Sequence, residues 1–252
     1  MKTLVINLND SAERLETITN AFSLHGLDFT RIEAVDGRSQ NALNFPQYND
    51  RKSNLRHGKS LSGGEVACYL SHIIALKTFL DSGDECGLIL EDDATAVDDF
   101  GSQIKDLENE LHKLNKWDVV NLTVRRDTWM KPCAKIARNE LRRAFYFPML
   151  ATANLWSRRG AITFLNGRYG KEIHGPFDTE LRSFCALRGK GLSLAVPIVQ
   201  PSGAPSDIDS SSHGYLNIKN LRNPGRRTIK SSLTRHWPDH ALAAFHYLTT
   251  KD

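Results

Sequence analysis

The sequence predicts an α/β fold in which a mostly parallel central sheet is flanked by helices. Two observations lead to this prediction. Short apolar runs without polar alternation, at residues 3–8 and 87–90, are typical of strands that are buried on both faces. Apolar residues at helical spacing lie between such runs, and the clearest of these patterns begins after Ser62. Because strands that alternate with helices form βαβ units, this order favours a parallel sheet.

The elements follow one another along the whole chain. The predicted strands are residues 3–8, 29–35, 87–90, 117–122, 145–156 and 192–199. The predicted helices begin at Asp10 or Ser11, at Ser62, at Asp98 or Asp99, at Ser157 and at Pro176, with a short helix near 239–248.

Local signals set the boundaries of these elements. Ser62 and Glu65 have the spacing of a capping box, which begins the longest helix. Gly26 follows the first helix, as glycine commonly does at a helix end. The polar residues 38–60 are expected to form a loop over the carboxyl edge of the sheet, and the basic residues 125–143 interrupt the pattern of strands and helices.

Length and composition indicate a soluble protein with one main domain. The 252 residues fit an α/β domain at residues 1–200, followed by a basic extension at 201–252 that is rich in Ser, Pro and Gly and is expected to be partly ordered. A hydrophobic fraction of 40% and a charged fraction of 25% are ordinary for a globular protein. The net charge of +4 is too small to indicate a nucleic-acid partner.

Basic residues concentrate at 125–143 and at 215–238, and the second segment contains no acid. Such stripes suit an anionic membrane surface or phosphates on a substrate, and a solvated tail explains them equally well. The four cysteines are widely spaced, without a CxxC pair, which favours a reducing compartment. With no signal peptide and no apolar membrane span in the sequence, we expect a cytoplasmic protein.

Glu91, Asp92 and Asp93 directly follow the apolar strand at 87–90. Open α/β sheets bind ligands at the carboxyl ends of their strands. Three adjacent carboxylates repel one another unless solvent, a cation or a basic ligand compensates their charge. A divalent cation that also binds phosphate oxygens would do so. A solvated strand end, with one acid capping the next helix, is an equally good reading of these residues alone.

Four segments together resemble glycosyltransferase family 25, which contains the lipooligosaccharide galactosyltransferases of Gram-negative bacteria and their collagen-modifying relatives. The segments are INL at 6–8 followed by Arg14, RIEAVDGR at 31–38, LSGGEVACYLSH at 61–72 and LILEDDA at 88–94. The resemblance continues more weakly at 117–122, 152–165 and 176–178, and it covers roughly the first 200 residues. It implies a GT-A-like fold, a nucleotide-binding sheet with an acidic motif at a strand end.

The resemblance implies that the acidic turn holds Mn²⁺ or Mg²⁺ against the diphosphate of a nucleotide sugar. Asp93 is expected to bind the metal. Glu91 is expected to bind the metal, a metal-bound water or the ribose, because it is longer than the aspartate usual at its place. Asp92 is expected to contact the nucleotide sugar or only to hold the turn. His213 is a candidate third metal ligand, since a late histidine has this role in many GT-A enzymes.

Asn7, Arg14 and Asp36 follow the first two strands and are assigned to nucleotide-sugar binding. Asn7 and Asp36 are expected near the base or ribose, and Arg14 near the diphosphate. An ion pair of Arg14 with Glu33 or Asp10, and a turn formed by Asp36, explain two of these residues equally well.

The helix that begins after Ser62 contributes Gly64, Glu65 and His72 to the same predicted site. Backbone N–H groups at Gly64 could face an anion, although close packing also explains the glycine. Glu65 and His72 lie seven residues apart and therefore on one helix face. Such a histidine is more often a core residue than a ligand, and the family pattern is the reason to keep His72.

Asp178 is the candidate catalytic base. An inverting transfer needs one group that removes the proton from the attacking hydroxyl. Asp178 follows Pro176 and Phe177 at a helix start that is expected to face the carboxyl edge of the sheet. A helix cap is the alternative role.

The sequence therefore predicts a transferase that moves a hexose, galactose by resemblance, from a UDP-sugar to the saccharide of a lipid-linked oligosaccharide with inversion. Peripheral contact with the anionic inner face of the inner membrane accompanies this prediction. An inactive family member that binds glycans or nucleotide sugars is the alternative. A metal-dependent phosphohydrolase is disfavoured because the sequence has no DxDx[TV] nucleophile pattern.

Overall fold

The computed structural model describes residues 1–114, 116–123, 128–203 and 237–250. The strands in these ranges are β1 (Lys2–Asn7), β2 (Thr30–Glu33), β3 (Cys86–Glu91), β4 (Ala94–Ala96), β5 (Val119–Asn121), β6 (Met130–Ile136), β7 (Asn139–Ala144), β8 (Ala153–Ser157), β9 (Gly191–Leu194) and β10 (Val199–Pro201). The helices are α1 (Ala12–Ser23), the 3₁₀ helix η1 (Ala42–Asn44), α2 (Asp50–His57), α3 (Gly63–Asp81), α4 (Phe100–Lys113), α5 (Arg158–Asn166), α6 (Arg168–Lys171), α7 (Phe177–Arg188) and α11 (Trp237–Thr249).

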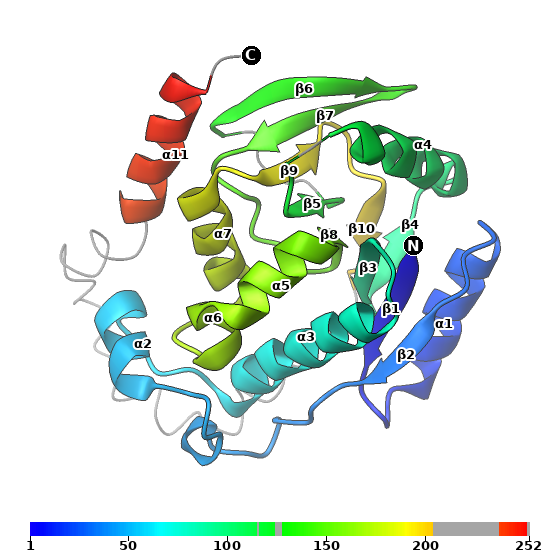
Figure 1. Cartoon of the computed structure of the whole chain (residues 1–252). Helices are drawn as coiled ribbons and strands as arrows, with labels where there is room; N and C mark the ends of the chain where they lie inside the picture. Colours follow the sequence, from blue (N-terminus) through cyan, green and yellow to red (C-terminus); the bar gives the residue numbers. More distant parts are fainter. Residues whose placement is uncertain (115, 124–127, 204–236, 251–252) are drawn as a thin grey trace.

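The described residues form an eight-stranded sheet in the order β2-β1-β3-β8-β5-β9-β7-β6, flanked by helices (Figure 1). β8 is antiparallel to both β3 and β5, and β7 is antiparallel to both β9 and β6. The other strands of this sheet all point the same way, and β1 is parallel to both β2 and β3. The predicted α/β fold is confirmed, with β8 and β7 as reversed strands in an otherwise parallel arrangement.

The apolar runs without alternation belong to strands with a hydrophobic core on each face. Leu4 of β1 and Ile89 of β3 pack into the core beneath α3, α5 and α7. Val5 and Leu88, one residue along in each strand, pack into the core beneath α1 and α4. Because successive strand residues point to opposite faces, both sets of positions must be apolar.

Parallel pairing brings the carboxyl ends of β1, β2 and β3 to the same edge of the sheet. Asn7 at the end of β1 lies opposite Glu33 of β2, and Ile6 lies opposite Glu91 of β3. The polar residues that follow these strands therefore meet at one place.

α3 begins at that same edge. Its capping box forms as expected: the Ser62 Oγ accepts the Glu65 N–H at 3.1 Å, and the Glu65 Oε2 accepts the Ser62 N–H at 2.8 Å. The helix start packs so closely on the loop after β2 that a Cβ at Gly63 would lie 2.1 Å from the Gln40 carbonyl oxygen. Glycine at this position allows α3 to start beside the ends of β1 and β2.

Two predicted irregular segments contain regular structure. The expected loop at 38–60 includes α2, whose N-cap Asn49 accepts the Lys52 N–H at 2.9 Å. α2 is almost entirely polar, so it gave no apolar periodicity. The basic segment at 125–143 contains most of the β6–β7 hairpin at the edge of the sheet. Most of its residues are neither fully buried nor fully exposed. Buried and exposed positions therefore do not alternate there, and the sequence shows no apolar alternation.

Within the predicted strand at 145–156, the structure has a strand only from Ala153 onward. The expected late helix near 239–248 is present as α11, which packs against α7.

The chain returns to the acidic turn at residues 199–202, at the end of the described range 128–203. β10 pairs antiparallel with β4, and the Ser202 N–H donates to the Asp93 carbonyl oxygen at 2.7 Å. β10 spans the boundary that we placed between residues 200 and 201, and the division into two parts stays a prediction. All four cysteines are free. Among the described helices, none has both the length and the apolar character that crossing a membrane requires.

Candidate functional site

A cavity of about 150 Å³ lies at the carboxyl ends of β1, β2 and β3, beside the start of α3. Eight of the predicted site residues line it, namely Asn7, Arg14, Asp36, Gly64, His72, Glu91, Asp92 and Asp93. Four segments that are far apart in the sequence, at 6–14, 34–38, 64–72 and 91–93, thus contribute to one cavity. Its position is the place where open α/β sheets bind ligands.

Asp92 has both carboxylate oxygens occupied by neighbours. The Asn7 Nδ2 donates to its Oδ2 at 2.8 Å, and the Arg14 guanidinium donates to its Oδ1 at 3.1 Å. The Arg31 Nε in turn donates to the Asn7 Oδ1 at 2.9 Å, which fixes the orientation of the Asn7 amide. The partner of Arg14 is therefore Asp92, rather than the Glu33 or Asp10 that we considered. Asp92 holds the turn against β1 and α1, and whether it also contacts a nucleotide sugar stays a prediction.

Asp93 is in the opposite situation. Its Oδ1 is buried without a hydrogen-bond partner, one of only two such side-chain atoms among the described residues. Burial, followed by the negative charges of Glu91 and Asp92, raises the pKa of Asp93 from its ordinary value of 3.8 to about 6. A cation would compensate this charge, and carboxylate oxygens are the donors that Mn²⁺ and Mg²⁺ prefer. Asp93 and Glu91 therefore fit the predicted metal.

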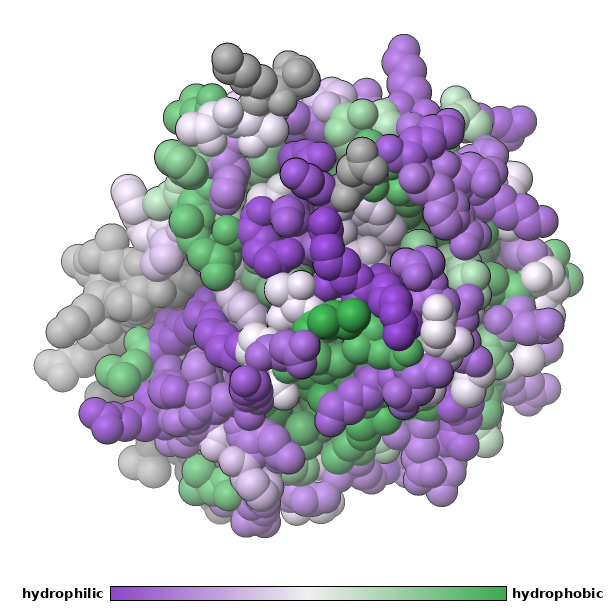
Figure 2. Space-filling view, viewed as in Figure 1, coloured by the Kyte–Doolittle hydropathy of each residue, from purple (hydrophilic) through white to green (hydrophobic). Residues whose placement is uncertain are grey.

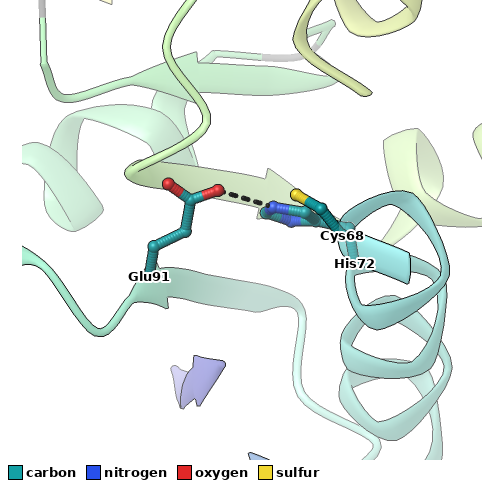
Figure 3. A group of neighbouring side chains, drawn as sticks. All are labelled: Cys68, His72 and Glu91. Atoms are coloured by element: carbon teal, nitrogen blue, oxygen red, sulfur yellow. Dashed lines mark hydrogen bonds and ion pairs between the residues drawn. The ribbon is translucent and has the colours of Figure 1, made fainter. Parts of the chain in front are cut away.

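Glu91 ends β3 and points toward α3. Figure 3 shows its carboxylate directed at the ring of His72, with the thiol of Cys68 beside them. The His72 Nε2 and the Glu91 Oε1 are 3.0 Å apart, and the His72 ring stacks on Phe177 with 3.9 Å between ring centroids. His72 thus pairs with Glu91, although its spacing on the helix had suggested Glu65.

Asp36 lies on the rim of the cavity. Its carboxylate accepts hydrogen bonds from Arg38, which lower the pKa of Asp36. Arg38 also pairs with Asp10 at 2.7 Å, so the rim carries an exposed group of charges. Asp36 keeps both of the roles that the sequence left open, as a turn residue and as an acceptor for a ligand.

A family model classifies the part of the chain that carries these residues. The model of glycosyltransferase family 25 (LPS biosynthesis protein) matches residues 1–149, which is more than half of the chain and contains the whole cavity. The chain belongs to glycosyltransferase family 25.

Curated relatives agree with this assignment to family 25. A glycosyltransferase 25 family member of Aedes aegypti is 29% identical over 46% of this chain and 20% of its own length. Procollagen galactosyltransferase 1 of Danio rerio is 27% identical over 53% of this chain and 23% of its own length. A probable inactive glycosyltransferase 25 family member 3 of Rattus norvegicus is 31% identical over 36% of this chain and 17% of its own length. The chain spans about a fifth of the length of these relatives.

Two predicted residues in the family 25 pattern do not line the cavity. Glu65 accepts the Ser62 N–H and pairs with Lys59 at 2.6 Å, so both of its oxygens serve the start of α3. Asp178 lies in the first turn of α7, directly after Phe177 in the sequence. Its Oδ1 accepts the Thr179 N–H at 2.7 Å, while Pro176 is the N-cap of the helix. The roles predicted for Glu65 and Asp178 in substrate chemistry stay predictions.

Asp178 is nevertheless close enough to the cavity to interact with its charges. Burial and the negative charge of Glu91 raise the pKa of Asp178, against the hydrogen bonds from Thr179 that lower it. The same Glu91 and Asp178 raise the pKa of the Cys68 thiol, for which burial is the largest cause. These residues therefore form one electrostatic group around the end of β3.

His213, the predicted third metal ligand, and most of the second basic segment lie outside the described residues. Sequence reasoning missed Arg31, Arg38, Cys68, Ser71 and Phe177 as parts of the site or its support. All except Phe177 stand inside the segments that carry the resemblance to family 25, which was the available signal.

Proposed function

We propose that the protein is a glycosyltransferase that transfers galactose from UDP-galactose to a saccharide hydroxyl of lipooligosaccharide, with inversion at the anomeric carbon. The observation that carries the proposal is the unpartnered, buried Oδ1 of Asp93 beside Glu91, in a cavity at the carboxyl edge of a family 25 sheet. The relatives that are named procollagen galactosyltransferases support galactose as the transferred sugar.

Asp93 and Glu91 would hold Mn²⁺ or Mg²⁺ in this proposal. Such a cation supplies electrostatic stabilisation for the negative charge that develops on the departing nucleoside diphosphate. The contribution of the chain is to place Asp93 before the cation arrives. The Ser202 N–H fixes the Asp93 backbone, and the contacts of Asp92 with Asn7 and Arg14 fix the adjoining residue.

The donor would lie between the end of β1 and the start of α3. Asp36 on the rim offers an acceptor for a ribose or base hydroxyl or amide, and Arg14 supplies a positive charge at the same edge. Gly64, in the first turn of α3, lines the cavity, and the positive end of the helix dipole there would favour an anion.

Asp178 would act as the general base. A base works best when its pKa approaches the operating pH, and burial together with Glu91 moves the pKa of Asp178 upward in that direction. The Thr179 N–H holds one carboxylate oxygen of Asp178, so the orientation of the group is fixed before the acceptor binds.

We also propose that the protein works at the cytoplasmic face of the membrane, where a lipid-linked acceptor would be reached. Trp237, Phe245 and Leu248 lie along one side of α11 and are exposed by 65%, 58% and 78%. Figure 2 shows apolar side chains over the position of α11. Lys131, which lies over the Tyr247 ring, adds positive charge beside this face, so anionic lipid is the occupant that fits both features.

Flotation with vesicles tests the membrane proposal. The protein should co-float with vesicles that contain phosphatidylglycerol and should dissociate as salt is raised. The double variant Phe245→Ser, Leu248→Ser should lose this binding, whereas Leu24→Ser, an exposed leucine after α1, should keep it. Equal flotation of all three proteins would overturn the proposal.

Calorimetry and turnover test the central proposal. UDP-galactose should bind the wild-type protein in the presence of Mn²⁺, and galactose should be transferred to truncated lipooligosaccharide. Asp93→Asn should lower turnover by about 100-fold or more, because it removes the anionic oxygen that holds the cation. Asp98→Asn, an exposed acid five residues further on, is the matched control and should leave turnover unchanged.

The alternative is a family member that binds nucleotide sugars or glycans without catalysis. The similarity to the probable inactive relative of Rattus norvegicus supports this alternative. Binding of UDP-galactose without any transfer or donor hydrolysis would support that alternative. The absence of binding to any UDP-sugar would overturn the transferase proposal and leave only a member that binds glycans.

A further inference from the structure

One wall of the cavity carries donors of three different kinds. The Cys68 Sγ, a ring nitrogen of His72 and a carboxylate oxygen of Glu91 all lie within 4.8 Å of one another. Figure 3 shows the three side chains converging from α3 and from the end of β3. They are the one such group of metal-binding side chains found among residues 1–114, 116–123, 128–203 and 237–250.

The geometry of this group comes from rigid elements. Cys68 and His72 are four residues apart in α3 and therefore lie on the same helix face. The His72 ring is stacked parallel to Phe177, with 5° between the ring planes, and its side chain is 2% exposed. The hydrogen bond of 3.0 Å to Glu91 joins α3 to β3. Little side-chain freedom remains to be lost when a ligand binds.

The donor types differ from those at Asp93. Sulfur, imidazole nitrogen and one carboxylate oxygen are the ligands typical of Zn²⁺, whereas Mn²⁺ and Mg²⁺ prefer oxygen. Zinc bonds of about 2.0–2.3 Å to such ligands bring the donor atoms to within about 4 Å of one another. The three atoms of this wall need to move only slightly to reach that arrangement, and the cavity leaves a fourth position open.

We propose that Cys68, His72 and Glu91 form a Zn²⁺ site that adjoins the Asp93 site and shares Glu91 with it, and that zinc bound there inhibits transfer by withdrawing Glu91 from the cation at Asp93. On binding, the thiol releases its proton to solvent and its sulfur forms a bond to the metal, while Glu91 exchanges its contact with His72 for one with zinc. Thiolate and carboxylate then neutralise the two charges of the ion. The inhibition, unlike the binding, rests on the function proposed above.

Cobalt substitution tests the binding without any substrate. Co²⁺ titrated into the reduced full-length protein should give a thiolate-to-cobalt charge-transfer absorption that saturates at one equivalent and disappears when Zn²⁺ is added. Cys68→Ser should abolish this absorption. Cys133→Ser is the matched control, because Cys133 is also a half-buried free thiol but lies in β6, and this variant should retain the absorption.

His72→Asn should weaken zinc binding by about tenfold or more, measured by competition with a chelating dye. Asp93→Asn should bind zinc as tightly as the wild type, which separates this site from the predicted Mn²⁺ site. Absence of the charge-transfer band in the wild type, or its persistence in Cys68→Ser, would overturn the site.

Inhibition is read as the ratio of turnover with and without Zn²⁺, each protein serving as its own reference. That ratio should be about one tenth in the wild type and should remain near one in Cys68→Ser at the same zinc concentration. An equal fall in both proteins would overturn the inhibitory role. A cobalt band in a protein without transferase activity would leave the zinc site standing and would count only against the proposed function.

Discussion

Two acids with buried carboxylate oxygens have opposite surroundings in this fold. Glu180 of α7 is 1% exposed and lies beneath α2 and α6, where Arg168 donates to its Oε2 at 2.8 Å and both Arg56 and His57 lie 3.4 Å from its Oε1. Asp93, at the cavity, has a buried oxygen without any partner.

The two environments shift the pKa in opposite directions. Burial alone would raise the pKa of Glu180, but the hydrogen bond with His57 and the charges of Arg56 and Arg168 outweigh it and lower the pKa. At Asp93 the nearest strong influences after burial are two further acids, and the pKa rises to about 6. Removing the partners of a compensated buried acid destabilises the fold, whereas an acid without compensation is itself destabilising and is typical of a binding site.

The largest expected effect concerns Asp178, the second acid of raised pKa near the cavity. Asp178→Asn should lower kcat by about 10²–10⁴-fold, because an amide cannot take up the proton of the attacking hydroxyl. The KM for UDP-galactose should stay within about twofold, since Asp178 does not line the donor cavity. Steady-state transfer assays measure both quantities. An unchanged kcat would show that Asp178 has no catalytic role and serves only the structure of the first turn of α7.

The next effect concerns the compensated acid. Glu180→Gln should destabilise the protein by about 2 kcal/mol, since it leaves Arg56 and Arg168 without their anionic partner in a partly buried place. The corresponding fall in Tm is about 4–8 °C for a protein of this size. Asp93→Asn, measured in EDTA at pH 8, should instead raise Tm. If both variants lowered Tm equally, the contrast between the two regions would be lost.

The pH dependence of stability sharpens the contrast for Asp93. Its pKa is about 6 when folded and 3.8 ordinarily, so between these values the folded protein binds the proton more readily than the unfolded chain. Stability therefore falls as pH rises through this window, and the penalty is complete above about pH 6.

Differential scanning fluorimetry from pH 4 to 8 in EDTA checks this expectation. The advantage of Asp93→Asn over the wild type should grow through the window and reach about 1 kcal/mol, allowing for solvent screening at the half-buried group. Added Mn²⁺ should stabilise the wild type more than the variant. An advantage that was the same at every pH would contradict the raised pKa.

The smallest effect concerns exposed acids. Asp36→Asn and Asp10→Asn each remove one partner of Arg38 at the surface, so stability should change by less than about 1 kcal/mol in both. Only Asp36 lines the cavity, so only Asp36→Asn should raise the KM for UDP-galactose, by about 3- to 10-fold. Equal KM values for the two variants would leave Asp36 as a turn residue.

The sequence predicted the site better than the contacts within it. Strands β1 and β3 could be predicted because burial on both faces leaves an unbroken apolar run, and the acidic turn follows directly. The partners of Asp92 could not be predicted, because Asn7 and Arg14 reach it across 85 and 78 positions of the chain. A local pattern carries no information on contacts of such separation.

The Glu180 group was missed for a related reason. Within α7, Glu180 reads as an ordinary polar helix residue, and its partners come from α2 and α6. α2 itself could not be predicted, because a helix without an apolar stripe shows no periodicity of apolar residues in the sequence. Likewise, the β6–β7 hairpin at the sheet edge lacks the apolar alternation that identifies a half-buried strand.

The short ribbon of β10 on β4 has a practical consequence for fragments of this protein. The Ser202 amide is bonded to the Asp93 carbonyl oxygen, and the Thr95 hydroxyl donates to the Gln200 carbonyl oxygen at 2.8 Å. The acidic turn therefore depends on residues more than a hundred positions later in the chain. A truncation intended to keep the cavity intact must end beyond Ser202, because a cut before β10 would remove the hydrogen bond that holds the Asp93 backbone.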